Sequence, residues 1–336
     1  MKNRLCRRRG ATAAAITLTL LAAVGCSASG SGGSDPGTAG DNGDGALTPI
    51  VVGALPIANF AYLYLGVEQG FFEEEGLEPT IEAVGTGSEL VAGAVAGSYD
   101  VIGSGYVPAF TAASQGIPLR IIGAADAGGS TLEDDWTPIS VGADSNITSP
   151  EQLAESVIAA NALKGVVEVT TRAAFDKLGI DTSNLELVEV PFPDMPGVLQ
   201  QGTVDAAYTV EPFAQQVKAN GGKPIFSPYA TLGKDFPNGG WQAMQQVIDQ
   251  DSEMVDAFIR ALKKSVDYAA ANPDAVREVI PTFTRVPAEV ADVMNLPVFV
   301  SELNRPALQE LLGYTEKYGV IEEMPNLDDL IYEPAS

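Results

Sequence analysis

From Ile50 onward, short apolar segments of strand length alternate with longer segments that have helical periodicity. This alternation is typical of an α/β fold with largely parallel sheets, because each parallel strand needs a crossover before the next one begins. The first predicted strands cover residues 50–55, 80–84, 100–103 and 119–124. Predicted helices cover residues 60–75 and 87–96, and a third begins near Tyr106.

A segment rich in Gly, Asp and Thr, residues 126–138, follows this first set and predicts a crossing between two lobes. The second set of predicted strands covers residues 139–141, 157–160, 185–190 and 206–210. Its predicted helices cover residues 166–178, 195–201 and 212–219. A second crossing is predicted near residues 226–232, and the chain beyond it is predicted to be mostly helical. There, Asp251 and Ser252 can cap a helix that Asn272-Pro273 ends.

Two α/β sets joined by two crossings place the carboxyl ends of their strands opposite each other, where sheets of this type bind ligands. We therefore predict two lobes around a cleft, joined by a hinge of two crossings. Residues 47–135 and 229–336 are predicted to form the first lobe, and residues 136–228 the second. Motion about the crossings would close the cleft on a ligand.

The first 26 residues are predicted to be an export signal and not part of the fold. Basic residues precede an apolar run over residues 11–24 that is too short to span a membrane. The run ends at Ala23-Val24-Gly25-Cys26, which resembles the bacterial lipobox and implies that Cys26 carries the lipid of an anchored protein. The alternative is an ordinary secretory signal with an incidental cysteine. Residues 27–46, rich in Gly, Ser and Asp, are predicted to be a flexible tether.

The composition excludes several classes of function. The chain has no histidine, which removes histidine-based acid/base catalysis, Ser-His-Asp triads and histidine-ligated metals. Its only cysteines are Cys6 and Cys26, so the predicted lobes have no disulfide and no thiol chemistry. The formal net charge of −25 makes nucleic acid and anionic membrane surfaces poor partners. We predict neither cofactor nor metal.

Several segments together resemble one family of binding proteins. Residues 52–62 and 65–77, with the sequences VGALPIANFAY and LGVEQGFFEEEGL, are similar to the start of substrate-binding proteins for nitrate, sulfonate, taurine and thiamine precursors. The segments NALKG (161–165), VPFPDMP (190–196) and VEPF (210–213) are similar to later parts of the same family. The resemblance implies a type 2 periplasmic-binding-protein fold without catalysis. It also implies a monomer that delivers a small-molecule ligand to an ABC permease and its ATPase at the extracellular face of the membrane.

In the first lobe, candidate ligand contacts follow the predicted strands. Thr86, Gly87 and Ser88 lie between a strand end and a helix start, so their backbone N–H groups can face an acidic or polar ligand group. The alternative is a simple N-cap by Thr86 or Ser88. Asn59 and Tyr62 fall on an earlier strand-to-helix loop, and Ser104 and Tyr106 fall on a later one; the resemblance implies ligand contact at such loops.

In the second lobe, Asn161 ends a strand, and Glu211 stands where another strand gives way to a helix. Glu211 would bind an amino group or protonated ring nitrogen, and Glu168 is a similar, weaker candidate. For Glu211 the alternatives are a helix N-terminal charge and a salt bridge. Aromatic side chains can stack on a flat ligand or serve as ordinary packing. These are Tyr62, Tyr106, Phe192 and Trp241.

The ligand class follows from one departure from the family. Sulfonate-binding relatives tend to carry hydroxyl residues after the glycine that corresponds to Gly165, where this chain has Val166 and Val167. We therefore favour a nitrogen heterocycle such as a thiamine pyrimidine precursor over taurine, an alkanesulfonate or nitrate. Two other functions are open: a pyrimidine-precursor synthase-like enzyme, and a lipoprotein that senses or scaffolds without transport. The relatives of that enzyme class depend on histidine and cysteine chemistry.

Overall fold

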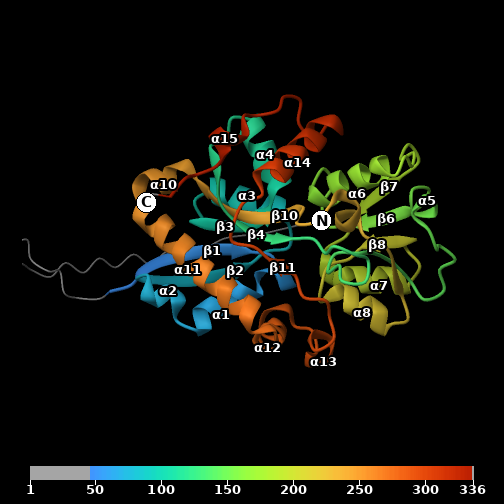
Figure 1. The fold of residues 1–336 in the computed structure, drawn as a ribbon, viewed down its shortest axis with the longest axis horizontal. Helices are drawn as coiled ribbons and strands as arrows, with labels where there is room; N and C mark the ends of the chain where they lie inside the picture. The colour runs from blue at the N-terminus through green and yellow to red at the C-terminus, as the bar shows by residue number, and fades with distance from the viewer. Residues whose placement is uncertain (1–45, 335–336) are drawn as a thin grey trace, which may run out of the picture. The chain divides into compact units, whose positions relative to one another are not determined.

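The structure is a computed structural model that describes residues 46–334. The predicted signal, the predicted lipidation site Cys26 and nearly all of the predicted tether therefore lie outside the described residues. Two β-sheets, each covered by helices, make up the described chain (Figure 1). Within this part, no helix is both long enough and apolar enough to cross a membrane.

The first sheet has six strands in the order β11-β4-β10-β3-β1-β2. Their bounds are β1 (Thr48–Ala54), β2 (Leu77–Ala83), β3 (Val101–Gly105), β4 (Leu119–Ala127), β10 (Pro237–Met244) and β11 (Val298–Phe299). β1 pairs in parallel with β2 and β3, whereas β10 runs antiparallel between β3 and β4. The two edges of the sheet thus differ in strand direction.

The second sheet has five strands in the order β7-β6-β8-β5-β9. Their bounds are β5 (Ile139–Val141), β6 (Val157–Ala160), β7 (Glu186–Glu189), β8 (Ala206–Tyr208) and β9 (Lys223–Phe226). β6 pairs in parallel with β7 and β8, and β5 pairs antiparallel with β8 and β9. The chain leaves the first sheet after β4 and returns to it after β9, so the predicted two crossings are confirmed.

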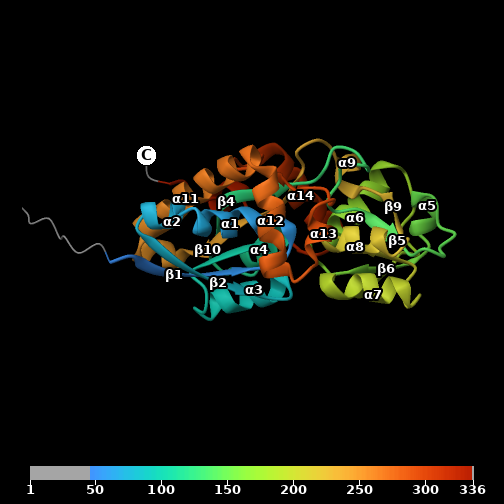
Figure 2. The same ribbon diagram turned by 90° about the horizontal axis from the view of Figure 1, so that it is seen from below.

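Helices connect the strands and cover both sheets (Figures 1 and 2). Those before β10 are η1 (Ala58–Phe60), α1 (Ala61–Glu68), α2 (Phe71–Glu74), α3 (Gly87–Val95), α4 (Tyr106–Ser114), α5 (Pro150–Leu153), α6 (Val166–Lys177), η2 (Phe192–Asp194), α7 (Met195–Gln200), α8 (Phe213–Ala219) and α9 (Pro228–Leu232). Those after it are α10 (Gln245–Gln250), α11 (Ser252–Ala271), α12 (Pro273–Thr284), α13 (Ala288–Ala291), α14 (Arg305–Lys317) and α15 (Leu327–Leu330).

The C-terminal part follows the prediction only in part. Helix α11 begins at the predicted cap, where the Asp251 side chain accepts the Met254 N–H over 2.9 Å, and ends before Asn272. Val255 and Phe258 of its apolar stripe are fully buried, and Phe258 packs against Trp241 of the first sheet. However, the mostly helical prediction for this part was wrong for residues 237–244, because strand β10 inserts there into the middle of the first sheet.

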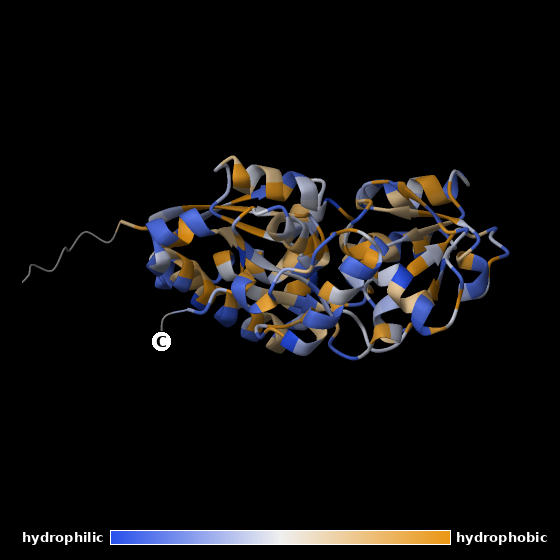
Figure 3. Ribbon diagram, turned by 90° about the horizontal axis from the view of Figure 1, so that it is seen from above, coloured by the Kyte–Doolittle hydropathy of each residue, from blue (hydrophilic) through white to orange (hydrophobic). Residues whose placement is uncertain are grey.

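Apolar residues concentrate on the strands and on the inner faces of the helices (Figure 3). Trp241, on β10, is fully buried and packs against Phe60 and Phe258 with ring centroids 5.4 and 5.3 Å apart. Glycine is required beside it: a Cβ on Gly240 would lie 2.5 Å from the Tyr106 ring. This close packing explains why glycine stands at position 240 within a strand that pairs with β3 and β4.

The two crossings are tied to each other by a buried carboxylate. Asp135, in the first crossing, accepts hydrogen bonds from the backbone N–H groups of Gly129 and Thr137 and from the Thr137 hydroxyl. The Ser227 hydroxyl, in the second crossing, donates to the other carboxylate oxygen of Asp135 over 2.5 Å. Desolvation raises the pKa of Asp135, and these hydrogen bonds oppose the rise. Asp135 therefore fixes where the chain passes between the sheets.

Candidate functional site

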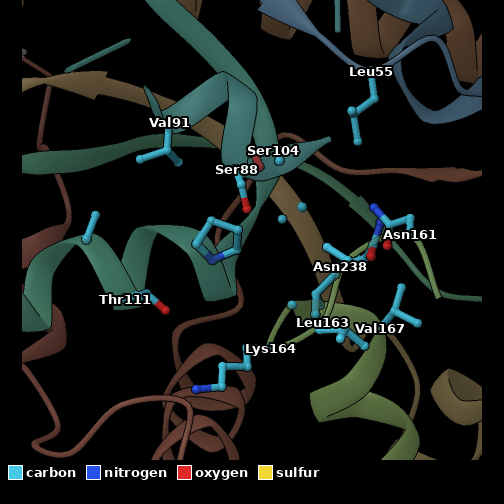
Figure 4. Close-up of a pocket in the computed structure, with 18 of the residues that line it drawn as sticks. Leu55, Ser88, Val91, Ser104, Thr111, Asn161, Leu163, Lys164, Val167 and Asn238 are labelled. Atoms are coloured by element: carbon cyan, nitrogen blue, oxygen red, sulfur yellow. The ribbon is translucent and has the colours of Figure 1, made fainter. Parts of the chain in front are cut away.

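A cavity of about 510 Å³ is lined by residues that follow strands of both sheets. From the first sheet come Leu55 after β1, Ser88 at the start of α3, and Ser104 near the end of β3 (Figure 4). The loop and helix start after β6, residues 161–167, line it from the second sheet. This is the position predicted for a ligand in an α/β fold, beyond the carboxyl ends of the strands.

Asn59 and Asn238 join the cavity lining to a buried carboxylate behind it. The Asn59 side-chain amide donates to Asp126 over 2.6 Å, and the Asn238 amide donates to the other oxygen of Asp126 over 2.7 Å. The Tyr229 hydroxyl completes the chain by donating to Asn238 over 2.6 Å. Burial raises the pKa of Asp126 to about 6, while the two amide hydrogen bonds lower it. Asp126 is therefore mostly ionised at neutral pH.

Several polar atoms at this wall have no hydrogen-bond partner among the described residues. They are the Asn59 carbonyl oxygen, the Ser104 hydroxyl and the Gln242 carbonyl oxygen. Gln242 lies just behind the cavity, and its amide donates to the backbone carbonyls of Ser104 and Gly105 over 3.3 and 3.1 Å. A buried polar group without a partner costs about 1–3 kcal/mol, so a ligand that supplies partners would recover that free energy.

The rest of the lining is largely apolar. One charged residue, Lys164, is among the lining residues that the structure describes, and its side chain is exposed. In Figure 4, Ser88 and Ser104 stand on the side of the first sheet, and Asn161, Leu163 and Val167 stand across from them. Apolar and aromatic side chains make up most of the walls: Leu55, Ile57, Phe60, Val91, Pro108, Leu163, Val166, Val167, Phe192 and Val210.

Six of the predicted ligand-contact residues line this cavity. They are Asn59, Gly87, Ser88, Ser104, Asn161 and Phe192. Ser104 lies near the end of β3, and the other five follow a strand of one of the two sheets in the sequence. Whether they touch a ligand remains a prediction.

Three aromatic candidates instead belong to the core of the first sheet. Tyr62 and Trp241 are fully buried, and the Trp241 indole N–H donates to the Tyr62 hydroxyl over 2.7 Å. Tyr106 is 1% exposed, and it borders a second hollow next to β4 and α11. None of the three lines the cavity between the sheets. These contacts agree with the alternative interpretation of the three residues as ordinary packing.

Thr86 and Glu168 serve the ends of helices. The Thr86 hydroxyl accepts the Glu89 N–H over 3.3 Å, and the Glu89 carboxylate accepts the Thr86 N–H over 3.1 Å, which forms a capping box for α3. Glu168 accepts the Lys164 N–H over 2.8 Å and pairs with Arg172 at 2.9 Å. Neither residue is part of the cavity lining.

Glu211 is fully buried away from the cavity. Its carboxylate accepts the N–H of Gln215 over 2.9 Å and that of Asn295 over 3.2 Å. Burial raises the pKa of Glu211 to about 7, and the two backbone hydrogen bonds act against this rise. The Glu211 carboxylate thus contacts backbone, in one case at the start of the helix that follows it, and its predicted amine contact stays a prediction.

Sequence reasoning missed Asn238, Asp126 and Tyr208. Asn238 lies on β10, the strand that was not predicted, and Asp126 lies at the start of the segment assigned to the first crossing. The only sequence signal for Tyr208 was its place on a predicted strand. Within residues 46–334, no group of three or more acidic, cysteine or histidine side chains is arranged to hold a metal ion.

Two α/β sheets joined by two crossings, with a cavity beyond their strand ends, define a type 2 periplasmic-binding-protein fold. The chain belongs to the NMT1/THI5-like family, whose sequence profile matches residues 57–276, more than half of its length. This confirms the resemblance seen in the sequence. No curated protein sequence matches the chain.

Solved structures show the same fold at low sequence identity. The ligand-binding component of an ABC-type import system from Staphylococcus aureus, with zinc bound, has a TM-score of 0.72 and 13% identity over 85% of this chain and 96% of that chain. The periplasmic nitrate-binding protein of Synechocystis has a TM-score of 0.71 and 15% identity, over 85% and 86%. The alkanesulfonate-binding protein of Xanthomonas axonopodis pv. citri, bound to MOPS, has a TM-score of 0.69 and 14% identity, over 85% and 98%.

Proposed function

We propose that this protein is the solute-binding component of an ABC importer and that it takes a small organic molecule into the cavity between its two sheets. One observation carries the proposal: the Asn59 carbonyl oxygen and the Ser104 hydroxyl belong to residues that line this cavity, and neither has a hydrogen-bond partner among the described residues. Buried polar groups are normally paired, so an unpaired set around one cavity favours a bound guest. The structural neighbours that bind nitrate and alkanesulfonate support this role.

We favour a nitrogen heterocycle, such as a pyrimidine precursor of thiamine, as the ligand. The walls of the cavity are mostly apolar, and Phe60 and Phe192 among them suit a flat ring. No arginine is among the lining residues that the structure describes, so a sulfonate or nitrate would lack the bidentate partner that suits an oxyanion. Taurine, an alkanesulfonate or nitrate is the alternative within the same class of protein.

The proposal includes the setting in which the protein acts. An acyl chain on Cys26 would hold a monomer at the extracellular face of the cell membrane, with residues 27–46 as a tether. From there the protein would deliver its ligand to a permease driven by an ATPase. The acidic composition argues against nucleic acid as a partner. Enzymatic turnover by a pyrimidine synthase-like route is disfavoured, because the chain has no histidine for the chemistry of that class.

A thermal-shift screen of the domain without its signal tests the proposal. The screen would include pyrimidines, thiamine, flavins, taurine, alkanesulfonates and nitrate. A ligand that binds only the folded state must raise the melting temperature, by an amount that grows with its concentration above Kd. We expect one ligand per chain by calorimetry and no change in the bound compound. Recovery of a chemically altered compound would reject the transport role in favour of an enzyme.

A further inference from the structure

We infer that the ligand of this cavity carries an extended apolar chain of about eight carbon atoms, which lies between α3 and α4 while a polar group is held at the inner end. The inference rests on the proposed function and deepens it. It adds to the ligand a part that a pyrimidine, taurine or nitrate alone does not have. It holds for whichever polar group the inner end takes.

The lining of the cavity follows one face of each of these two helices. On α3 it consists of residues at spacings of three and four, namely Ser88, Val91, Ala92 and Val95. On α4 the same spacings recur at Pro108, Thr111, Ala112 and Gln115. Residues spaced in this way share a helix face, and each stripe rises through seven residues, about 10 Å. Because α3 contacts α4, the two stripes border one groove, as long as an extended chain of about eight carbon atoms.

The surface of this groove is mostly apolar, and none of the residues of the two stripes is charged. The Thr111 hydroxyl donates to the Val107 carbonyl over 3.0 Å, so it is already paired within its own helix. At the outer end Val95 is 50% exposed, and Leu163, which lines the cavity from the side of the second sheet, is 47% exposed. An apolar chain in the groove would cover this surface, which favours binding.

The hydrogen-bonding groups gather at the other end of the cavity. Ser104 and Asn161 lie where strands of the two sheets end. In Figure 4, Ser88 stands between Asn161 on one side and Val91 and Thr111 on the other. A polar group held near the strand ends would therefore leave the whole groove unfilled. A ligand that fills the cavity is polar at one end and apolar at the other.

Two homologous series measure the contribution of the chain. One consists of 1-alkylimidazoles and the other of alkanesulfonates, each from methyl to dodecyl, so that two different polar groups carry the same chains. In calorimetry on the domain without its signal, we expect Kd to fall about threefold to fourfold for each added methylene group in whichever series binds. The gain should level off beyond about eight carbon atoms, where the groove ends.

Variants in the groove test whether the chain lies there. Ala92→Phe and Thr111→Phe place a ring in the groove from opposite sides, one from α3 and one from α4. Both should remove the gain of the longer chains and leave the affinity of the methyl members close to wild type. Ala96→Phe is the matched control, because Ala96 is exposed at the end of α3 and does not line the cavity. Melting temperatures report whether each variant is folded.

Three outcomes decide between the possibilities. A gain per methylene group that persists in both groove variants would place the chain elsewhere and overturn the inference. If a protein partner covers the groove instead, the solute screen would yield a ligand while neither series gains affinity with chain length, which also overturns it. Failure of every compound in the screen and in both series would reject the proposed function itself.

Discussion

The Glu211 carboxylate accepts the backbone N–H of Asn295 over 3.2 Å, although 84 residues separate them in the sequence. Asn295 in turn donates its side-chain amide to the carbonyls of Glu133 and Asp135 over 2.8 and 2.9 Å. The second sheet is thereby connected to the segment after α13 and to the first crossing. Glu211 is thus part of the connection between the two sheets and not of the cavity wall.

Replacing Glu211 with glutamine should change how stability depends on pH. The pKa of Glu211 is raised to about 7 in the folded protein, above the 4.5 of an ordinary glutamate. The folded state therefore binds the proton more tightly, and stability that is fully present below pH 4.5 is lost as the pH rises through about 7. From about pH 5 to about pH 8, Glu211→Gln should gain about 1–3 kcal/mol relative to wild type.

Urea unfolding at the two pH values measures this difference. At about pH 5, Glu211→Gln should be no more stable than wild type. The glutamine side chain has one carbonyl oxygen, so one of the two N–H groups that Glu211 accepts, those of Gln215 and Asn295, then faces the amide nitrogen. Glu278→Gln, on the exposed face of α12, is the matched control. A difference between Glu211→Gln and wild type that is the same at both pH values would contradict the prediction.

Tyr62→Phe should destabilise the fold and leave ligand affinity unchanged. The Trp241 indole N–H donates to the Tyr62 hydroxyl over 2.7 Å inside the core, so its loss leaves a buried donor unpaired at a cost of about 1–3 kcal/mol. Tyr64→Phe is the control, because Tyr64 is only partly buried and stacks on Phe283 with ring centroids 4.0 Å apart. A fall in affinity with unchanged stability would instead favour the sequence interpretation of Tyr62 as a ligand contact.

The strand–helix alternation was sufficient to predict most of the fold. Strands β5 and β6 have the predicted bounds, because short apolar runs between turn residues leave little choice of conformation. Strand β10 was missed because Asn238-Gly239-Gly240 has the composition of a turn. Its strand conformation comes from pairing with β3 and β4, and glycine is needed at position 240 because the Tyr106 ring occupies the space of a side chain there. That contact spans more than a hundred residues and has no local signal.

The candidate site could be predicted where it follows strand ends, as at Ser88, Ser104 and Asn161. It could not be predicted where function and packing use the same residue types. Trp241 and Phe192 have similar chemistry, yet only Phe192 lines the cavity, because β10 turns Trp241 towards α11. Asp126 was missed because its role depends on two amides, one before it in the sequence and one far after it.

Cys26→Ser should release the protein from the membrane. If Cys26 carries the lipid, the variant loses the acyl chains that hold the exported domain at the cell surface. Metabolic labelling with a palmitate analogue, followed by fractionation of membranes and medium, should show label only in wild type. Cys6→Ser is the matched control, since Cys6 lies within the predicted signal and would be removed. Equal labelling of wild type and Cys26→Ser would favour an incidental cysteine.

Gly105→Val should weaken ligand binding more than it weakens the fold. Gly105 ends β3 of the first sheet, and a Cβ added to it would lie 3.0 Å from a methyl group of Val166, which begins α6 beyond the second sheet. The Gly105 backbone has φ −60° and ψ 157°, a conformation that valine also adopts. The substitution therefore strains the contact with Val166 and not the backbone of residue 105. If ligand binding needs the two sheets to approach, the added methyl groups oppose that approach, and affinity should fall about tenfold or more with a melting temperature close to wild type. Gly197→Val, where an added Cβ meets nothing within 4 Å, is the control. Undiminished affinity in Gly105→Val would mean that the ligand is held without further approach of the two walls.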